Sequence, residues 1–290
     1  MSNLAVPIIY DLLNSQPDVL CERVYAPWTD MGAVMQERGI PLLSLESKHP
    51  LKDFDIIGFS LGYELTYTNV LYMLHLAQIP VIASERNDGH PIVIAGGTCA
   101  LNPEPMADFI DLFVIGDGED AALELLDCYR QRKTKGGNGA KEEFLRQAAA
   151  IPGIYVPSLY HVEYQGDGVI KSFTPLAPEA KPGIRRRIVP KLPPPVTNPV
   201  VPYIEVVHDR GAIEIQRGCS RGCRFCQAGI IYRPVRERPE EEVLQAAGEL
   251  VRNCGYDEVS LVSLSTSDYG EIEELVASCL LYTSDAADEL

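Results

Sequence analysis

The amino-acid sequence predicts an α/β protein with two domains. An N-terminal Rossmann-like, doubly wound parallel sheet is expected over residues 1–150, and the start of a (β/α) barrel over residues 206–278. Three observations predict this. Apolar runs of strand length alternate with helical stretches, which is typical of parallel sheets covered by helices. A proline-rich stretch separates the two parts, and 290 residues suffice for two hydrophobic cores.

The first part contains four strand candidates, each rich in β-branched residues: CERVYA (21–26), DIIGFS (55–60), PIVIAGG (91–97) and LFVIGDGE (112–119). Helical patterns such as TNVLYMLHLAQI and EDAALELLDCYRQRK lie between them. Ligands of such sheets bind beyond the carboxyl ends of the strands, where this sequence places Ser60, Gly96 and Gly97. The chain opens on an amphipathic helix, LAVPIIYDLLNS, rather than a strand, so the first strand is expected to be missing.

Residues 151–205 are predicted to form a β-hairpin and a linker. The sequence YHVEYQGDGVIKSF has a Gly-Asp-Gly turn between two strand patterns. The stretch 175–202 is too rich in proline for a helix or a central strand, and extended chain is expected there. Its basic run, Arg185–Arg187, is interpreted as a solvated face.

The second part has the order strand, loop, helix, strand, helix, which is typical of the start of a barrel. GAIEIQRG (211–218) is the first strand, a helix begins at Pro239, DEVSLVSLSTSD is the second strand and GEIEELVAS begins a further helix. Residues 279–290 lack an amphipathic period and resemble the translation of a sequencing adapter. They are therefore set aside as an artefact, and the barrel is expected to be truncated.

The composition bounds the functional classes. A formal net charge of −16 argues against bulk binding of nucleic acid or of an anionic membrane. No apolar run reaches the length of a membrane span, and no signal peptide is evident, so a cytoplasmic location is expected. Of eight cysteines, four are scattered among apolar neighbours and are interpreted as small buried fillers: Cys21, Cys99, Cys128 and Cys254.

The remaining feature is the loop GCSRGCRFCQAG, which places Cys219, Cys223 and Cys226 within eight residues. A structural zinc site usually has a second cysteine pair, which is absent, and His208 is a weak fourth ligand. Ferredoxin-type clusters need four cysteines, and a nucleophilic cysteine needs a neighbouring histidine. Three thiolates can instead hold three irons of a [4Fe-4S] cluster and leave the fourth iron open to a cofactor. A zinc site, a plain cluster site and a chance group of thiols remain alternatives.

The motif CSRGCRFC resembles the signature of the radical S-adenosylmethionine (SAM) enzymes. The resemblance implies that Cys219, Cys223 and Cys226 bind a [4Fe-4S] cluster, and that Phe225 packs near the adenine of SAM. It implies reductive cleavage of SAM to a 5′-deoxyadenosyl radical, with a low-potential donor such as flavodoxin or ferredoxin. The family's acidic glycine-rich motif after the second strand is replaced here by hydroxyl groups and a carboxylate. The corresponding candidates for SAM contact are Ser263, Ser265 and Asp268, with a capped helix start as the alternative.

The N-terminal part is similar to cobalamin-binding members of that superfamily, and closest to a subgroup with a cobalamin-binding-like domain. Ser60 matches the family's Ser-x-Leu motif, although Gly62 stands in the place of the leucine, and Gly96-Gly97 matches its paired glycines. The Asp-x-His-x-x-Gly loop is absent. The resemblance implies cobalamin as a further cofactor, and three explanations of the missing loop stay open: the chain is clipped at its N-terminus, cobalamin binds without that histidine, or the domain binds no corrinoid. Tight turns between strand and helix are the alternative explanation of the glycines. The substrate cannot be inferred from the sequence.

Overall fold

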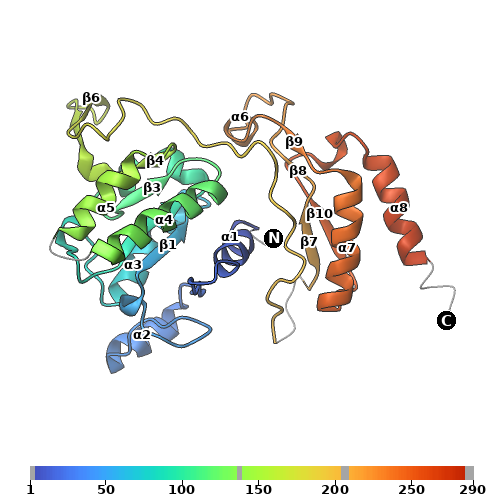
Figure 1. Cartoon of the computed structure of the whole chain (residues 1–290), viewed down its shortest axis with the longest axis horizontal. Helices are drawn as coiled ribbons and strands as arrows, with labels where there is room; N and C mark the ends of the chain where they lie inside the picture. The colour runs from blue at the N-terminus through green and yellow to red at the C-terminus, as the bar shows by residue number, and fades with distance from the viewer. Residues whose placement is uncertain (1–3, 136–138, 204–208, 285–290) are drawn as a thin grey trace. The chain divides into compact units, whose positions relative to one another are not determined.

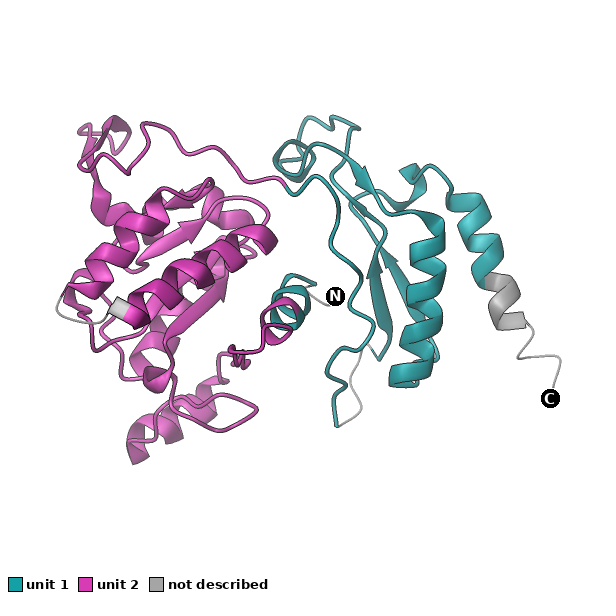
Figure 2. Ribbon diagram, in the orientation of Figure 1, with its two compact units in different colours: residues 1–11, 189–290 teal, residues 12–188 magenta. Residues whose placement is uncertain are grey.

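The computed structural model describes residues 4–135, 139–203 and 209–284. The chain divides into two compact units, one of residues 12–188 and one of residues 1–11 and 189–290 (Figure 2). Helix α1 (Ala5–Asn14) spans the division at residue 11. No helix of the described residues is long and apolar enough to cross a membrane.

The unit of residues 12–188 is built on a four-stranded sheet with the order β1-β2-β3-β4. The strands β1 (Ile56–Ser60), β2 (Ile92–Gly96) and β3 (Leu112–Val114) are parallel, and β4 (Ile154–Tyr155) adds an antiparallel edge. The parallel α/β architecture predicted from the sequence is confirmed. The short strand β4 has no sequence signal beyond two apolar residues.

Helices accompany this sheet in the order that the apolar patterns predict (Figure 1). Their bounds are α2 (Thr29–Arg38), α3 (Tyr67–Leu76), α4 (Glu119–Lys135) and α5 (Ala140–Ala149). The core joins the fully buried β3 to apolar side chains of these helices, among them Leu74 and Phe144. Single 3-10 turns join the elements: η1 (Leu51–Asp53), η2 (Glu64–Thr66), η3 (Ala83–Glu85), η4 (Thr98–Leu101), η5 (Glu104–Met106) and η6 (Pro157–Leu159).

The strand predicted at residues 21–26 is wrong, because this segment has no strand structure. The backbone N–H and the backbone carbonyl of Arg23 form hydrogen bonds with two different residues, and neither bond belongs to a strand ladder. The N–H donates to a carboxylate oxygen of Glu46 at 2.8 Å, and the carbonyl accepts from Leu45 N–H at 2.8 Å. A charged side chain thus takes a donor that a strand ladder would need.

The predicted hairpin is present as β5 (Tyr160–Tyr164) and β6 (Ile170–Pro175), which pair antiparallel. Its Tyr160 and Phe173 rings stack with centroids 4.5 Å apart and both pack on Tyr155 of β4. The hairpin is therefore fixed to the sheet by an aromatic cluster.

The basic run after the hairpin is not simply a solvated face. The backbone of Arg187 pairs in parallel with Gly116 beyond β3, and its guanidinium contacts Glu124 and lies 3.6 Å from Asp120. The side chain of Arg187 is only 17% exposed. The interpretation as a solvated face is therefore wrong for Arg187.

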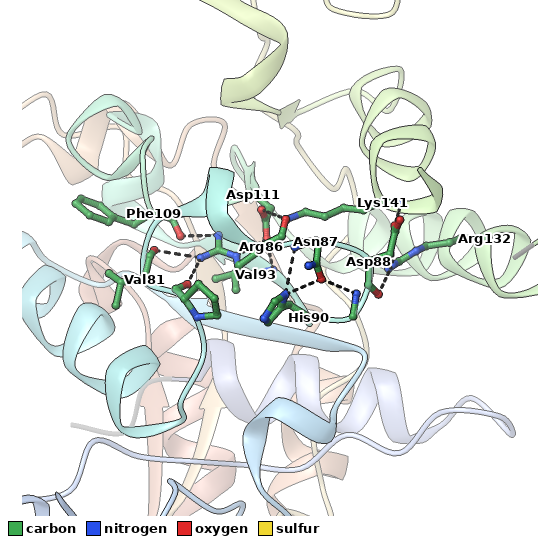
Figure 3. Close-up of polar contacts among 12 residues, drawn as sticks. Val81, Arg86, Asn87, Asp88, His90, Val93, Phe109, Asp111, Arg132 and Lys141 are labelled. Carbon is green, nitrogen blue, oxygen red and sulfur yellow. Dashed lines mark hydrogen bonds and ion pairs between the residues drawn. The ribbon is translucent and has the colours of Figure 1, made fainter. Parts of the chain in front are cut away.

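A buried polar cluster lies near the amino ends of β2 and β3 (Figure 3). Arg86 donates to Asp111 at 3.2 Å and to the carbonyls of Pro80 and Phe109 at 2.9 and 2.8 Å. Lys141 donates to Asp111 at 2.8 Å and to the carbonyl of Arg86 at 3.0 Å. Asp111 also accepts from the N–H of the second β2 residue, so this cluster ties η3, both strands and α5 together.

The other unit contains one strand-helix-strand motif whose strands β7 (Gly211–Glu214) and β10 (Val259–Val262) pair in parallel. Between them lie β8 (Gln216–Arg217), α6 (Ala228–Ile231), β9 (Arg236–Glu237) and α7 (Glu240–Cys254), and after them η7 (Thr266–Asp268) and α8 (Ile272–Ser284). The core includes Ile213, Ile215, Leu250 and Leu275. This is the arrangement expected for the beginning of a (β/α) barrel.

The proline-rich stretch is held along this unit by side-chain donors. Arg236 donates to the carbonyl of Val189 at 2.7 Å, Arg238 to that of Pro193 at 2.7 Å, and Asn253 to that of Thr197 at 3.1 Å. Extended proline-rich chain has no internal hydrogen bonds, so its carbonyls are open to such donors.

Candidate functional site

The cysteine loop connects β8 to α6, immediately after the first parallel strand. Strand β8 pairs antiparallel with β9, with Gln216 opposite Glu237 and Arg217 opposite Arg236. This short ribbon brings together the two ends of the segment that contains the cysteines. The cysteine loop therefore begins at the carboxyl end of β8, where the pairing of β8 with β9 holds the two ends of the segment together.

Gly218 fixes the start of the loop. Its φ is +93°, and a Cβ atom at this position would lie 2.5 Å from the carbonyl oxygen of Tyr232 and 2.6 Å from that of Pro234. Both the backbone conformation and the close approach of the returning chain require glycine. The residue before Cys219 is thus determined by packing and not by metal chemistry.

The three cysteines differ in exposure. Cys223 is exposed, and Cys219 and Cys226 are partly exposed. The N–H of Cys226 donates to the carbonyl of Cys223 at 3.0 Å, and the N–H of Gly229 donates to Cys226 Sγ at 3.3 Å. Arg233 Nε donates to the carbonyl of Cys219 at 3.4 Å.

No three His, Cys, Asp or Glu side chains of the described residues are close enough together to hold a single metal ion. A mononuclear site needs its ligands within roughly 2.0–2.3 Å of one point, whereas each cysteine of an iron–sulfur cluster binds a different iron. Three thiols separated along one loop are the donor set that suits a cluster. His208, the weak fourth ligand suggested by the sequence, lies outside the described residues.

Asp268, at the end of η7, is tied to the cysteine loop. Arg221 Nε, between the first two cysteines, donates to Asp268 Oδ2 at 2.6 Å, and Ser265 Oγ donates to the same oxygen at 2.7 Å. The Arg221 guanidinium, followed by Ser265, lowers the pKa of Asp268 to about 2. The carboxylate is therefore ionised at neutral pH, and it raises the pKa of Arg221.

A pocket of about 770 Å³ lies beside the cysteine loop and combines part of the predicted site with residues that were not predicted. Cys219, Ser265 and Asp268 line it, as predicted residues. The other lining residues are Gln216, Ser220, Arg233, Pro234, Val235 and Glu237. The polar interruption of the apolar strand at Gln216, just before the cysteines, is the sequence signal that could have indicated this wall.

Two of the predicted SAM-contact residues do not line the pocket. Ser263 Oγ accepts from Ser265 N–H at 3.2 Å and lies 3.0 Å from Thr266 Oγ1, so it shapes the turn after β10. Phe225 is 92% exposed. Its place beside an adenine ring stays a prediction.

The four scattered cysteines have surroundings that suit the filler interpretation. Burial raises the pKa of the Cys99, Cys128 and Cys254 thiols, and raises that of Cys21 to about 11. These thiols are protonated at neutral pH and therefore poor nucleophiles or ligands. Within the cysteine loop, Cys223 is more exposed than any of these four cysteines.

In the unit of residues 12–188, Ser60 and Gly96 are register partners at the carboxyl ends of β1 and β2. Gly97 has φ +103°, and a Cβ there would lie 2.8 Å from the carbonyl oxygen of Leu61. A Cβ on Gly96 would meet Val114 Cβ at 3.7 Å, which is ordinary contact. Packing within the chain therefore requires glycine at position 97 and does not require it at position 96.

Comparisons with known proteins agree with this arrangement. The family model described as radical SAM proteins, N-terminal, matches residues 5–157, and that of the radical SAM superfamily matches residues 213–285. An uncharacterised protein of Methanocaldococcus jannaschii is 29% identical over 240 residues, which are 80% of this chain and 43% of that protein. The ribosomal protein uS12 methylthiotransferase of Nitrosomonas europaea is 27% identical over 57% of this chain and 35% of its own length.

Among solved structures, the radical SAM methyltransferase TsrM from Kitasatospora setae, with cobalamin and a [4Fe-4S] cluster bound, has a similar fold. The TM-score is 0.52 at 14% identity, over 96% of this chain and 49% of that one. The chain thus spans less than half the length of each of these three proteins. Since the N-terminal family model covers more than half of it, the chain belongs to the radical SAM proteins.

Proposed function

We propose that the chain is part of a radical SAM enzyme in which Cys219, Cys223 and Cys226 hold a [4Fe-4S] cluster and SAM binds in the adjoining pocket. The single observation that carries this is Cys219 in the wall of a pocket of about 770 Å³, next to two further cysteines on the same loop. Pockets of roughly 300–1,000 Å³ suit small-molecule ligands. When bound, the cluster supplies the electron that splits SAM into methionine and a 5′-deoxyadenosyl radical.

The residues of the chain have separate tasks in this proposal. The three thiolates bind iron, and the Gly229 N–H, which donates to Cys226 Sγ, orients that sulfur. Asp268 supplies a fixed negative charge in the pocket wall, held in place by Ser265 and Arg221. The exposure of Cys223 leaves the loop accessible to an external electron donor, for which flavodoxin or ferredoxin is the proposed class.

The test is anaerobic reconstitution with iron and sulfide, reduction with dithionite, addition of SAM, and chromatographic detection of 5′-deoxyadenosine. The unmodified chain should form it, and Cys219→Ala, Cys223→Ala and Cys226→Ala should each lose cluster and product. Cys128→Ala is the matched control and should retain both. A chain that binds iron or zinc but never cleaves SAM would instead be a non-catalytic metal-binding module.

A second proposal concerns a corrinoid at the carboxyl ends of β1 and β2. It is favoured by Gly96, where no contact with the described residues requires a glycine, beside the exposed end of β1 at Ser60. The structural relative that binds cobalamin has this fold, and a bound corrinoid would supply methyl transfer.

A spectral titration with hydroxocobalamin tests this second proposal. Gly96→Val should weaken binding at least tenfold while circular dichroism stays unchanged, because only Val114 lies near the new side chain. Gly58→Val, in the same sheet with nothing within 4 Å of a Cβ, is the control. Absence of any spectral change with the unmodified chain would leave this unit as a scaffold.

A further inference from the structure

Gln216 has an unusual environment in the pocket wall. Its side chain belongs to a residue that is only 3% exposed, yet Oε1 has no hydrogen-bond partner among the described residues. A buried carbonyl oxygen without a donor is costly, and native structures retain few of them. The atom lies in a residue that lines the same pocket as Cys219, Ser265 and Asp268.

The surrounding wall is rich in acceptors. Glu237 lies opposite Gln216 in the β8–β9 ribbon and also lines the pocket, as does the ionised Asp268. A ligand that satisfies such a wall must bring N–H or O–H donors. SAM carries them in its amino group, its ribose hydroxyls and its adenine amino group.

We infer that Gln216 is a SAM-contact residue whose Oε1 accepts a hydrogen bond from a donor group of SAM. The inference rests on the proposed function, because it takes SAM as the occupant of the pocket. In a residue that contributes only to the fold, a buried side-chain oxygen usually accepts a hydrogen bond from another group of the protein. Gln216 instead leaves the oxygen without a donor until the ligand supplies one.

This role has a signature that distinguishes it from a structural one. Gln216→Met keeps the length of the side chain and removes the unsatisfied oxygen. In the chain without ligand the variant should unfold at a temperature equal to or above that of the unmodified chain, since a buried unpaired acceptor is lost. A structural role predicts the opposite, a lower unfolding temperature.

Binding is measured by equilibrium dialysis of radiolabelled SAM against the iron–sulfur-reconstituted chain, kept oxidised so that no turnover occurs. Gln216→Met should raise the Kd roughly tenfold, the effect of one hydrogen bond lost from a buried site. Gln245→Met, an exposed glutamine on α7, is the matched control and should change nothing.

Iron content must be equal in all variants, so that a loss of affinity is not a loss of cluster. Unchanged SAM affinity in Gln216→Met would overturn the inference. The proposed function fails separately. A chain that binds SAM but never forms 5′-deoxyadenosine contradicts the enzyme proposal and still leaves the affinity of the Gln216→Met variant to decide the inference.

Discussion

The buried cluster of Arg86, Asp111 and Lys141 and the cysteine loop are both polar, but they handle their polar groups in opposite ways. In the cluster, Arg86 and Asp111 have side chains 0% and 2% exposed, and each is bonded to several partners. In the cysteine loop, one thiol is exposed and two are partly exposed, and the buried Oε1 of the adjoining Gln216 has no partner among the described residues. Polar groups that satisfy one another hold a fold together, whereas unsatisfied or exposed reactive groups indicate a ligand.

The largest expected effect is in the cysteine loop and concerns chemistry alone. Cys223→Ala should reduce SAM cleavage by several orders of magnitude, because a cluster with two thiolate ligands is not retained. The free energy of unfolding of the metal-free chain should stay within about 0.5 kcal/mol, since the side chain is exposed. Denaturant titration of the metal-free protein measures this. A large loss of stability would break the contrast between the two regions.

The second effect is in the buried cluster and concerns stability alone. Arg86→Met should destabilise the unit of residues 12–188 by about 3–5 kcal/mol, because the carbonyls of Pro80, Val81 and Phe109 lose this donor and Asp111 loses one of its donors. Asp111 keeps its ion pair with Lys141. Iron binding by the cysteine loop should be unaffected at temperatures where the variant is folded. Denaturant unfolding and iron analysis give the two values.

Arg146→Met is the matched control for Arg86. Its guanidinium is 38% exposed and bonded to Glu142 one helical turn away. Such surface pairs contribute about 0.3–0.5 kcal/mol. Equal losses in Arg146→Met and Arg86→Met would show that burial does not distinguish the two arginines.

The smallest expected effect is a shift in titration. Asp268 has a folded-state pKa of about 2 because Arg221 and then Ser265 donate to it. A carboxyl with a lowered pKa contributes stability above its unfolded value, near 3.8, and that contribution is lost as the pH falls toward 2. In the metal-free chain, Arg221→Gln should move the NMR titration midpoint of Asp268 up toward 3.8, and Arg210→Gln should not. An unmoved midpoint would mean that Arg221 does not hold the carboxylate.

Local patterns predicted much of the fold. The strands around residues 56–60, 92–96 and 112–114 are confirmed as apolar, β-branched runs, with β3 fully buried, β2 largely buried and β1 partly exposed. The end of α7 at Gly255 follows from the left-handed conformation of that glycine. The strand prediction for residues 21–26 was wrong because the side chain of Glu46, distant in the sequence, accepts a hydrogen bond from the backbone N–H of Arg23. The prediction of a solvated face was wrong for Arg187 because a basic run does not reveal that its backbone will pair with the chain after β3, at Gly116.

Local patterns also predicted only some of the residues of the candidate site. The cysteines could be found from their spacing in one loop, and Asp268 from its place after the second strand. Gln216, Arg233 and Glu237 could not, because they come together through the pairing of β8 with β9 and the return of the chain after α6. These three residues are brought together by contacts between segments distant in the sequence, which the spacing of residues in one loop does not reveal.

The contact of Gly218 with the carbonyls of Tyr232 and Pro234 has a consequence for the order of assembly. The two ends of the cysteine loop are held together by the polypeptide itself. The entropy of ring closure is therefore lost during folding, so the cluster proposed above would be inserted into a loop that is already closed.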